Sequence, residues 1–285
     1  MRLIIFILSI VFIITNIEAK NGCCSHHGGV KGCICADGTP LSSKCLLSYP
    51  KCNNTSTNKV LLKNIQDTNN STIKTSLNYL ENFISLIPRD QILHKKAFTI
   101  YYNYKHKTPN IVFYTLYANL VNKNNYSRKG FSFRPDFEIP KKYRSYSNDY
   151  THSGYDRGHN APNASFDYNR SIQKETFLMS NIAPQAKWLN RKYWAKVERL
   201  ARFLAVKYKK IEVVTGNCGS IGHLKNNVNI PAYWFKIIYI PKNKKSNIFL
   251  VPNKNDGMKT AKIKKYQIDS IDKIIDICNF KKNIQ

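Results

Sequence analysis

From about residue 76 to the end of this 285-residue chain, apolar residues occur in short runs, and one longer segment among them has helical periodicity. Short runs rich in aromatic and β-branched residues are typical of strands. These runs cover 98–104, 110–120, 211–215, 233–240 and 248–252. The pattern predicts a mixed α+β fold in which antiparallel strands surround at least one long helix.

The longer segment, residues 185–208, has the spacing of an amphipathic helix. Tyr193, Val197, Leu200 and Leu204 occupy positions i, i+4, i+7 and i+11, which places them on one buried stripe. This stripe would anchor the helix to the core and leave its neighbouring face available for polar residues.

Polar side chains follow a second line of the same predicted helix. Asn190, Glu198 and Arg202 are separated by multiples of four residues, so the line drifts by about 40° per step. Mg²⁺ prefers oxygen ligands and keeps several waters, which makes Asn190 the first candidate for a metal ligand. Glu198 would then hold a water on the ion, and Arg202 would face a phosphate. Alternatively, Glu198 and Arg202 form a solvated i, i+4 ion pair.

Upstream of this segment, residues 156–159 read Asp-Arg-Gly-His. A neutral His159 imidazole can accept a proton from water near neutral pH, as a general base does. Arg157 offers a planar, permanently charged group to phosphate oxygens. Gly158 permits either backbone torsions or a close approach of neighbouring groups that a side chain would block. These residue types suit phosphodiester hydrolysis, although an isolated histidine is more often structural.

The charge balance points to a polyanionic partner. Lys and Arg number 45 against 17 Asp and Glu, a formal net charge of +28. Such a charge favours nucleic acid first, and anionic membranes or cell-wall polymers second. A general bias towards Lys, Asn and Ile in the source proteome would account for part of the excess.

Residues 150–202, which include YDRGHNAP, TFLMSNIAPQ and LNRKYWAKVERLAR, resemble the DNA/RNA non-specific endonuclease family. That family includes mitochondrial endonuclease G and bacterial secreted nucleases that do not distinguish DNA from RNA. The similarity extends from about residue 90 to about residue 280 and takes in FRPDFEIP, VVTGN, IPAYWFKI and FLVPN. The resemblance implies a ββα-metal core, with a central antiparallel sheet flanked by helices. The base would lie on a hairpin and the ligand asparagine on a helix.

The resemblance also implies a role for each matching residue. His159 would activate the attacking water, and Asn190 would be the single direct protein ligand of Mg²⁺ or Mn²⁺. Glu198 would orient a water on the metal, and Asn181 would hold His159 or the substrate. The arginines implied to contact phosphate are Arg157, Arg202 and an upstream residue that maps to Arg128, with Arg134 as the second choice.

These observations predict an exported, metal-dependent endonuclease that cuts DNA and RNA with little sequence preference. Affinity for the phosphate backbone carries no sequence information. The resemblance implies products with 5′-phosphate and 3′-hydroxyl ends. The alternative is a secreted basic protein that has lost turnover and only binds nucleic acid or anionic surfaces. A stable membrane partner is not expected.

The N-terminal part divides into three zones before the expected nuclease domain, residues 76–285. Residues 1–19 are typical of a signal peptide, with Arg2, an apolar stretch over 3–14 and Ala19. That stretch is shorter than the roughly 20 residues of a membrane span, which disfavours the alternative of an uncleaved anchor. A cysteine-rich cassette over 20–52 and a polar linker over 53–75 follow. We therefore expect a periplasmic or secreted protein.

Cysteine usage agrees with export. The cassette contains Cys23, Cys24, Cys33, Cys35, Cys45 and Cys52. In an oxidising compartment these cysteines predict disulfides, with fifteen possible pairings. A zinc site that uses His26 or His27 is the alternative. Cys218 and Cys278 lie far downstream and could pair with each other.

Overall fold

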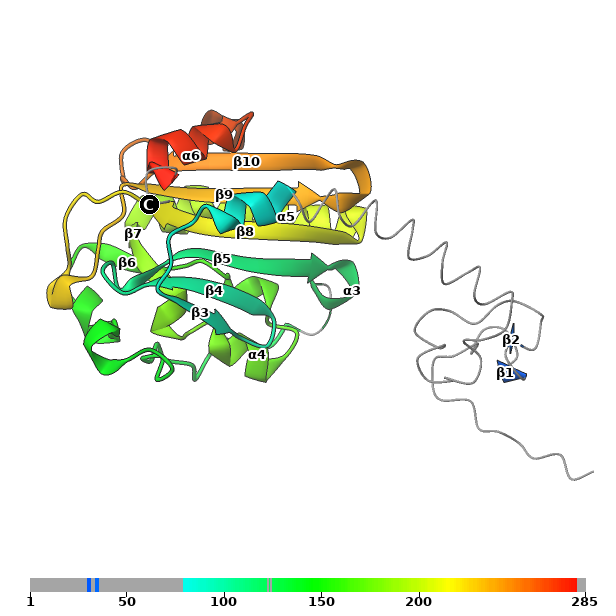
Figure 1. Ribbon diagram of the computed structural model, residues 1–285, viewed down its shortest axis with the longest axis horizontal. Coiled ribbons are helices and arrows are strands. Elements are labelled where there is room, and N and C mark those ends of the chain that lie inside the picture. The colour runs from blue at the N-terminus through cyan, green and yellow to red at the C-terminus, as the bar shows by residue number, and fades with distance from the viewer. Residues whose placement is uncertain (1–29, 32–33, 36–78, 122, 124, 281–285) are drawn as a thin grey trace, which may run out of the picture. The chain divides into compact units, whose positions relative to one another are not determined.

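The computed structural model describes residues 30–31, 34–35, 79–121, 123 and 125–280 (Figure 1). The chain forms two compact units, Met1–Thr75 and Ser76–Gln285. In the first unit the described residues form a hairpin of β1 (Val30–Lys31) and β2 (Ile34–Cys35). The expected signal peptide, the linker and the cysteine pairing of the cassette lie outside the described residues.

In the second unit, the described residues form an antiparallel seven-stranded sheet in the order β11-β10-β9-β8-β5-β4-β3 (Figure 1). The bounds are β3 Gln91–His94, β4 Phe98–Asn103, β5 Thr108–Tyr117, β8 Lys210–Cys218, β9 Tyr233–Ile240, β10 Lys245–Pro252 and β11 Gln267–Ile268. Each of the five apolar runs contributes a strand, which confirms the α+β prediction. The run over 110–120 leaves the sheet at Tyr117 and ends in a helical turn.

The helices are short, apart from α5. Residues 79–85 are helical. They are followed by α3 Ala118–Val121, α4 Arg170–Glu175, α5 Ala195–Tyr208 and α6 Asp272–Cys278. Short 3-10 turns cover Lys141–Tyr143, Ser147–Tyr150, Asn163–Ser165, Met179–Asn181, Lys225–Asn227, Pro241–Asn243 and Ile263–Tyr266. Among the described residues, no helix combines the length and hydrophobicity that a membrane crossing requires.

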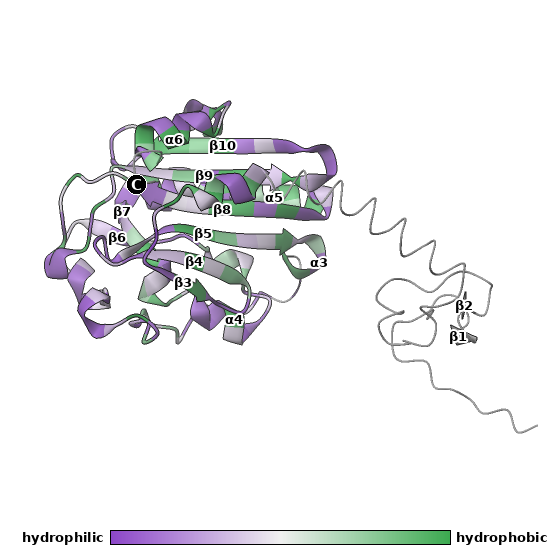
Figure 2. Ribbon diagram, in the orientation of Figure 1, coloured by the Kyte–Doolittle hydropathy of each residue, from purple (hydrophilic) through white to green (hydrophobic). Residues whose placement is uncertain are grey.

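The sheet is buried on both faces, as alternate residues of β9 show. Trp234 and Ile238 pack into the cluster that includes α5, whereas Phe235 and Ile237 pack into the cluster that includes helix 79–85 and α6. Successive strand residues point to opposite faces, so a strand covered on both sides is apolar throughout. The hydropathy colouring agrees, because hydrophilic residues concentrate in the loops and at strand ends (Figure 2).

The predicted helix over 185–208 begins later than expected. Residues 182–186 form β7 (Ile182–Ala186), which pairs antiparallel with β6 (Tyr155–His159). A π-helical turn follows over Leu189–Trp194, and α5 begins only at Ala195. Helical conformation begins at Lys187, so the prediction is wrong only at Gln185 and Ala186, which belong to the strand.

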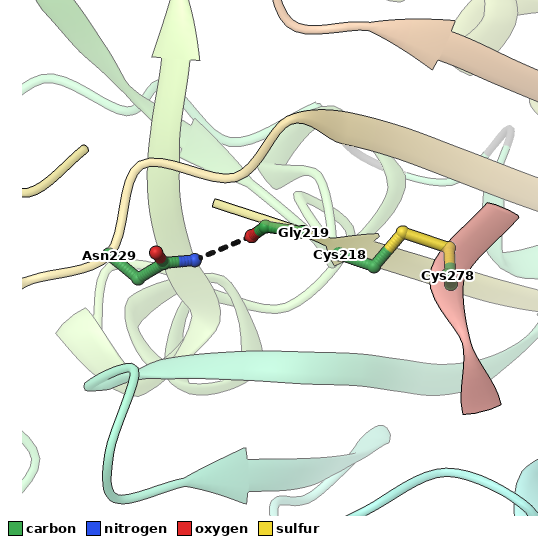
Figure 3. Close-up of a disulfide and its surroundings, with 4 residues drawn as sticks. All are labelled: Cys218, Gly219, Asn229 and Cys278. Carbon is green, nitrogen blue, oxygen red and sulfur yellow. Dashed lines mark hydrogen bonds between the residues drawn. A yellow bond between two sulfur atoms is a disulfide. The ribbon is translucent and has the colours of Figure 1, made fainter. Parts of the chain in front are cut away.

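A disulfide joins Cys218, the last residue of β8, to Cys278, the last residue of α6 (Figure 3). It connects residues 60 positions apart in the sequence and holds α6 against the sheet. Beside it, the Asn229 side-chain amide donates to the Gly219 carbonyl oxygen over 2.9 Å (Figure 3). The structure thus contains the Cys218–Cys278 disulfide, a pairing that the sequence left open.

Candidate active site

A cavity of about 620 Å³ opens between the β6–β7 hairpin and the helix that follows it. Its lining residues come from three places in the chain. The hairpin contributes Tyr155, Asp156, Arg157 and His159; the helical segment contributes Asn190, Arg191, Ala195 and Glu198; the loops contribute Arg128, Phe133, Pro162, Asn163 and Ala164. Polar groups from a strand and a helix therefore meet in one hollow, as the sequence predicted for His159, Asn190 and Glu198.

His159 is the last residue of β6 and pairs with Ile182 of β7. Its ring packs against Phe133 and Phe177, with centroid distances of 5.4 and 5.5 Å. Burial, and secondly the positive charge of Arg128, lower the pKa of His159 to about 3. The imidazole is therefore neutral at physiological pH, and one of its ring nitrogens carries no proton.

The Nε2 atom of His159 is buried and has no hydrogen-bond partner among the described residues. Buried polar atoms in folded proteins nearly always have a partner, so an orphaned one marks a place that a ligand or water completes. A purely structural histidine would be expected to satisfy both nitrogens within the protein.

Gly158 lets the hairpin pack closely. A Cβ at this position would lie 2.6 Å from both Cβ and Oε1 of Gln185 and 3.0 Å from Cζ2 of Trp234. Glycine is thus required for a close approach rather than for an unusual backbone torsion. This packing fixes the strand that carries Arg157 and His159.

Asp156 connects the hairpin to the helical segment. Its Oδ2 accepts from the Asn190 side-chain nitrogen at 2.9 Å and from Arg191 Nε at 2.8 Å, and its Oδ1 accepts from Arg191 Nη2 at 2.7 Å. Because the amide nitrogen of Asn190 is engaged, its amide oxygen is the group left for a ligand in the cavity. Asp156 therefore fixes the orientation of the asparagine in the cavity that His159 also lines.

Two arginines of the lining are held by aromatic rings. Arg157 donates through Nη2 to the Ser147 carbonyl oxygen at 2.7 Å and lies over Phe133, while its buried Nε has no partner among the described residues. Arg128 is exposed and lies 5.2 Å from the centroid of Phe177. Both guanidinium groups are placed to bind an anion next to His159.

Glu198 lies on α5 at the cavity wall. Burial raises the pKa of its carboxyl group, and the charges of Lys236, Arg202 and Arg199 oppose that rise. Glu198 makes no ion pair with another described residue. The alternative reading, a surface ion pair between Glu198 and Arg202, is therefore not seen in the part of the chain that the structure describes.

Three predicted site residues lie outside the lining of this cavity. Arg202 lines an adjoining hollow that shares Ala164 with it. Arg134 donates to the Lys174 carbonyl oxygen at 2.9 Å, so Arg128 is the better placed of the two upstream arginines. Asn181 is fully buried, and its side chain bonds only to backbone groups.

Asn181 instead shapes the chain that follows His159. Its Oδ1 accepts from the Ala161 backbone nitrogen at 2.8 Å, and its Nδ2 donates to the Ala161 and Thr176 carbonyl oxygens at 2.9 Å each. Asn181 thus fixes the loop two residues beyond the histidine.

Three further residues at or near the site, Arg191, Phe133 and Lys236, have only weak signals in the sequence. Arg191 adjoins Asn190 and forms the ion pair with Asp156 at the cavity rim. Phe133 lies within FRPDFEIP and packs on His159, which no local spacing signals. Lys236 lies in an apolar run, where a lone lysine among seven hydrophobic residues is the available signal.

The donor set fits one hydrated hard cation better than a protein-enclosed metal. Among the described residues, no group of three or more His, Cys, Asp or Glu side chains is arranged to hold a metal. An amide oxygen at Asn190 and a nearby carboxylate at Glu198 match an ion that keeps most of its waters.

Similar proteins are nucleases. The mitochondrial nuclease of Saccharomyces cerevisiae is 32% identical over 168 residues, which cover 53% of this chain and 51% of that protein. Nuclease C1 of Cunninghamella echinulata is 31% identical over 185 residues, which cover 59% of this chain and 73% of that protein. The chain thus spans about half the length of the yeast relative.

The fold is shared with a solved structure. A chain in the crystal structure of the EndoG/EndoGI complex, which describes the mechanism of EndoG inhibition, superposes with a TM-score of 0.62 at 26% identity. The match covers 67% of this chain and 85% of that chain. It agrees with the ββα arrangement in which β6, β7 and the following helix carry His159 and Asn190.

The profile of the family described as DNA/RNA non-specific endonuclease matches residues 77–284, which include the sheet, the β6–β7 hairpin and the whole cavity lining. The chain belongs to the DNA/RNA non-specific endonuclease family.

Proposed function

We propose that this protein is an exported endonuclease that hydrolyses phosphodiester bonds of DNA and RNA with the help of a divalent cation, Mg²⁺ or Mn²⁺. The observation that carries the proposal is the shared cavity, in which the neutral His159 imidazole and the Asn190 amide oxygen face a common space. Products with 5′-phosphate and 3′-hydroxyl ends belong to the proposal.

His159 acts as the general base. Its neutral ring takes a proton from a water molecule, which attacks phosphorus as the bond between phosphorus and the 3′-oxygen breaks. The departing 3′-oxygen takes up a proton from solvent and becomes the 3′-hydroxyl. The surrounding Phe133 and Phe177 rings restrict the orientation of the imidazole. Asn181 holds the loop after the histidine, which makes it a positioning residue.

The Asn190 amide oxygen would hold the cation, and Asp156 fixes the orientation of that amide. When bound, the cation supplies Lewis-acid stabilisation of the extra negative charge on the phosphoryl oxygens. Glu198 orients water at the cavity wall.

Arginine side chains supply the affinity for the substrate backbone. Arg128, Arg157 and Arg191 line the cavity or its rim, and Arg202 extends the positive charge into the adjoining hollow. Each would bind phosphate oxygens, which are common to every sequence and to both DNA and RNA. This supports cleavage without sequence preference.

Export remains a proposal that rests on the sequence of residues 1–19 and on the cysteine content. The Cys218–Cys278 disulfide supports it, because disulfides persist mainly in oxidising compartments. Relatives that are named mitochondrial show that the family is not confined to secreted proteins. Fractionation of expressing cells would locate the mature protein, and N-terminal sequencing would test cleavage near Ala19.

Plasmid cleavage by purified protein tests the enzymatic assignment. We expect cleavage with Mg²⁺, none with EDTA, and a loss of roughly 10²–10⁴-fold in kcat for His159→Ala. His94→Ala is the matched control, because His94 is exposed on β3 and lies outside the cavity lining.

A binding assay separates the endonuclease from the alternative, a protein that only binds nucleic acid. Electrophoretic mobility shifts of a DNA fragment in EDTA should show that His159→Ala still binds. Wild-type protein that binds DNA but gives no cleavage with either cation would overturn the enzyme and support the binding-only alternative.

A further inference from the structure

The hollow that adjoins the active-site cavity has a lining of its own. Its volume is about 460 Å³, and it shares Ala164 with the active-site cavity. Helix α5 contributes Arg202, Phe203 and Val206 to its lining, and Asp167 lines it from the loop before α4. Sites for small organic groups typically have volumes of about 300–1,000 Å³, so this hollow is large enough for part of a substrate.

Phe203 is the residue of this hollow that the core does not explain. It is 59% exposed, whereas the next residue, Leu204, is buried in the core. Consecutive residues of an α-helix are about 100° apart around the axis, so Phe203 lies off the buried stripe. A single exposed phenylalanine is common on protein surfaces. What distinguishes Phe203 is its place in a hollow continuous with the active-site cavity.

Arg202 adds an unsatisfied cation beside this ring. Its Nη1 is buried and has no hydrogen-bond partner among the described residues, and it makes no ion pair with any of them. Buried polar atoms nearly always have a partner, so this guanidinium group has capacity for an anion that reaches the hollow. A phosphate group fits the planar arrangement of its donors.

Asp167 restricts what else the hollow can bind. Its carboxylate lines the hollow and makes no ion pair with another described residue. The negative charge disfavours a phosphate on this side, whereas the amino group of a nucleobase can donate to a carboxylate. The hollow thus offers a cation for a phosphate, an aromatic ring for the face of a base and an acceptor for its edge.

The hollow lies within reach of a nucleotide near the cleaved bond. Glu198 lines the active-site cavity, and Arg202 follows it by four residues, about 6 Å along the helix axis. A duplex strand advances about 3.4 Å per nucleotide, so a nucleotide one or two positions from the scissile phosphate would reach Arg202. In a duplex both faces of its base are covered by stacking, so only an unpaired base can lie on the Phe203 ring.

We propose that the hollow lined by Arg202, Phe203 and Asp167 is a subsite for one unpaired nucleotide next to the cleaved bond, whose base stacks on Phe203. The inference rests on the proposed function, because it concerns the substrate of the same site. It makes Phe203 a specificity-determining residue that favours single-stranded over double-stranded nucleic acid.

The test compares the binding of a labelled single-stranded oligonucleotide with that of a blunt duplex of the same sequence. Fluorescence anisotropy in EDTA, with all variants in the His159→Ala background, measures binding without cleavage. Phe203→Ala should weaken single-strand binding by about fivefold or more, the loss expected for one stacked base. It should leave duplex binding unchanged. Because Phe203 is exposed, the truncation should leave the free energy of unfolding nearly unaffected.

Two further variants separate stacking from apolar contact. Phe203→Trp keeps an aromatic ring and should retain the single-strand affinity of the parent. Phe203→Leu keeps an apolar side chain without a ring and should bind as weakly as Phe203→Ala. Phe137→Ala is the matched control, because Phe137 is 72% exposed and lines neither the active-site cavity nor the hollow. It should leave the affinity for both probes unchanged.

Unchanged single-strand affinity in Phe203→Ala, an equal loss with both probes, or full affinity in Phe203→Leu would overturn the subsite. With His159 restored and Mg²⁺ present, kcat/KM of Phe203→Ala should fall by a similar factor on the single strand and stay unchanged on the duplex. Selective loss of single-strand binding in a protein that cleaves no nucleic acid would reject the proposed function alone. Wild-type cleavage of the single strand that Phe203→Ala does not reduce would reject the subsite alone.

Discussion

At the scale of single residues, the cavity is defined by groups that the protein does not satisfy internally. The buried nitrogen of His159 and the Nε of Arg157 have no hydrogen-bond partner among the described residues. By contrast, the Asn190 amide nitrogen and both Asp156 oxygens are bonded. The site thus combines side chains fixed by hydrogen bonds with buried polar atoms that have no partner within the described residues.

The lowered pKa of His159 predicts an unusual pH dependence of the free energy of unfolding. The folded histidine titrates at about 3, whereas an unfolded histidine titrates near 6.5. Between these values the unfolded chain binds a proton that the folded chain does not, so stability rises with pH over this window and is lost as pH falls. NMR titration of the metal-free protein should show a neutral His159 at pH 5.

Urea unfolding at pH 4.5 and pH 7 supplies the second measurement. We expect His159→Ala to reduce the difference in stability between the two pH values, because the variant lacks the group responsible. A His159 resonance that titrates near 6.5, together with an unchanged difference in the variant, would show that the ring is solvated in solution.

At the scale of elements, the π-helical turn over Leu189–Trp194 sets the relation between Asn190 and Glu198. In a π-helix the backbone hydrogen bonds join residues i and i+5, in place of i and i+4. The Asn190 side chain therefore points in a different direction around the helix axis than it would in a regular α-helix. Such turns are frequent at functional sites. The polar line expected from four-residue spacing is therefore interrupted, and Arg202 lies in the adjoining hollow.

The C-terminal helix α6 depends on its disulfide. Removal of the Cys218–Cys278 bond in a Cys218→Ser/Cys278→Ser variant should lower the free energy of unfolding by about 2–4 kcal/mol, because the unfolded chain regains entropy. Urea unfolding measures this loss.

The cavity residues lie on other elements, so kcat of the folded double variant should match that of the wild type. Equal unfolding midpoints for the two proteins would mean that packing alone holds α6. A large loss of kcat without loss of stability would reveal a connection between α6 and the site that the contacts do not contain.

At the scale of the whole molecule, the net charge of +28 favours association with polyanions. Arg128, Arg157 and Arg191 supply three cations at the cavity. The logarithm of the DNA-binding constant should therefore fall linearly with the logarithm of salt concentration, with a slope of about −3 or steeper.

Fluorescence anisotropy with the His159→Ala variant in EDTA measures this slope without cleavage. Arg191→Gln should reduce its magnitude by about 1, whereas Lys244→Gln, in the distant turn between β9 and β10, should leave it nearly unchanged. Binding that is insensitive to salt would contradict a backbone-directed interface.

Much of the fold and of the candidate site follows from local sequence. The apolar run over 233–240 became a strand with those bounds, because a run of bulky apolar residues suits a doubly covered sheet. Asn190 and Glu198 line one cavity and belong to one local helical segment, although the π-helical turn changes the regular spacing between them. The Asp-Arg-Gly-His motif placed His159 and Arg157 there as well.

Other features depended on contacts between residues distant in the chain. Residues 182–186 became a strand because residues 155–159 were available to pair with them. The lowered pKa of His159 requires Phe133, Phe177 and Arg128 around it, and Lys236 became a buried cation because β9 passes beneath α5. The sequence by itself determined the types of chemical group and their local periodicity. Only the tertiary structure decided which groups are shielded from water, because shielding depends on everything that packs around a side chain.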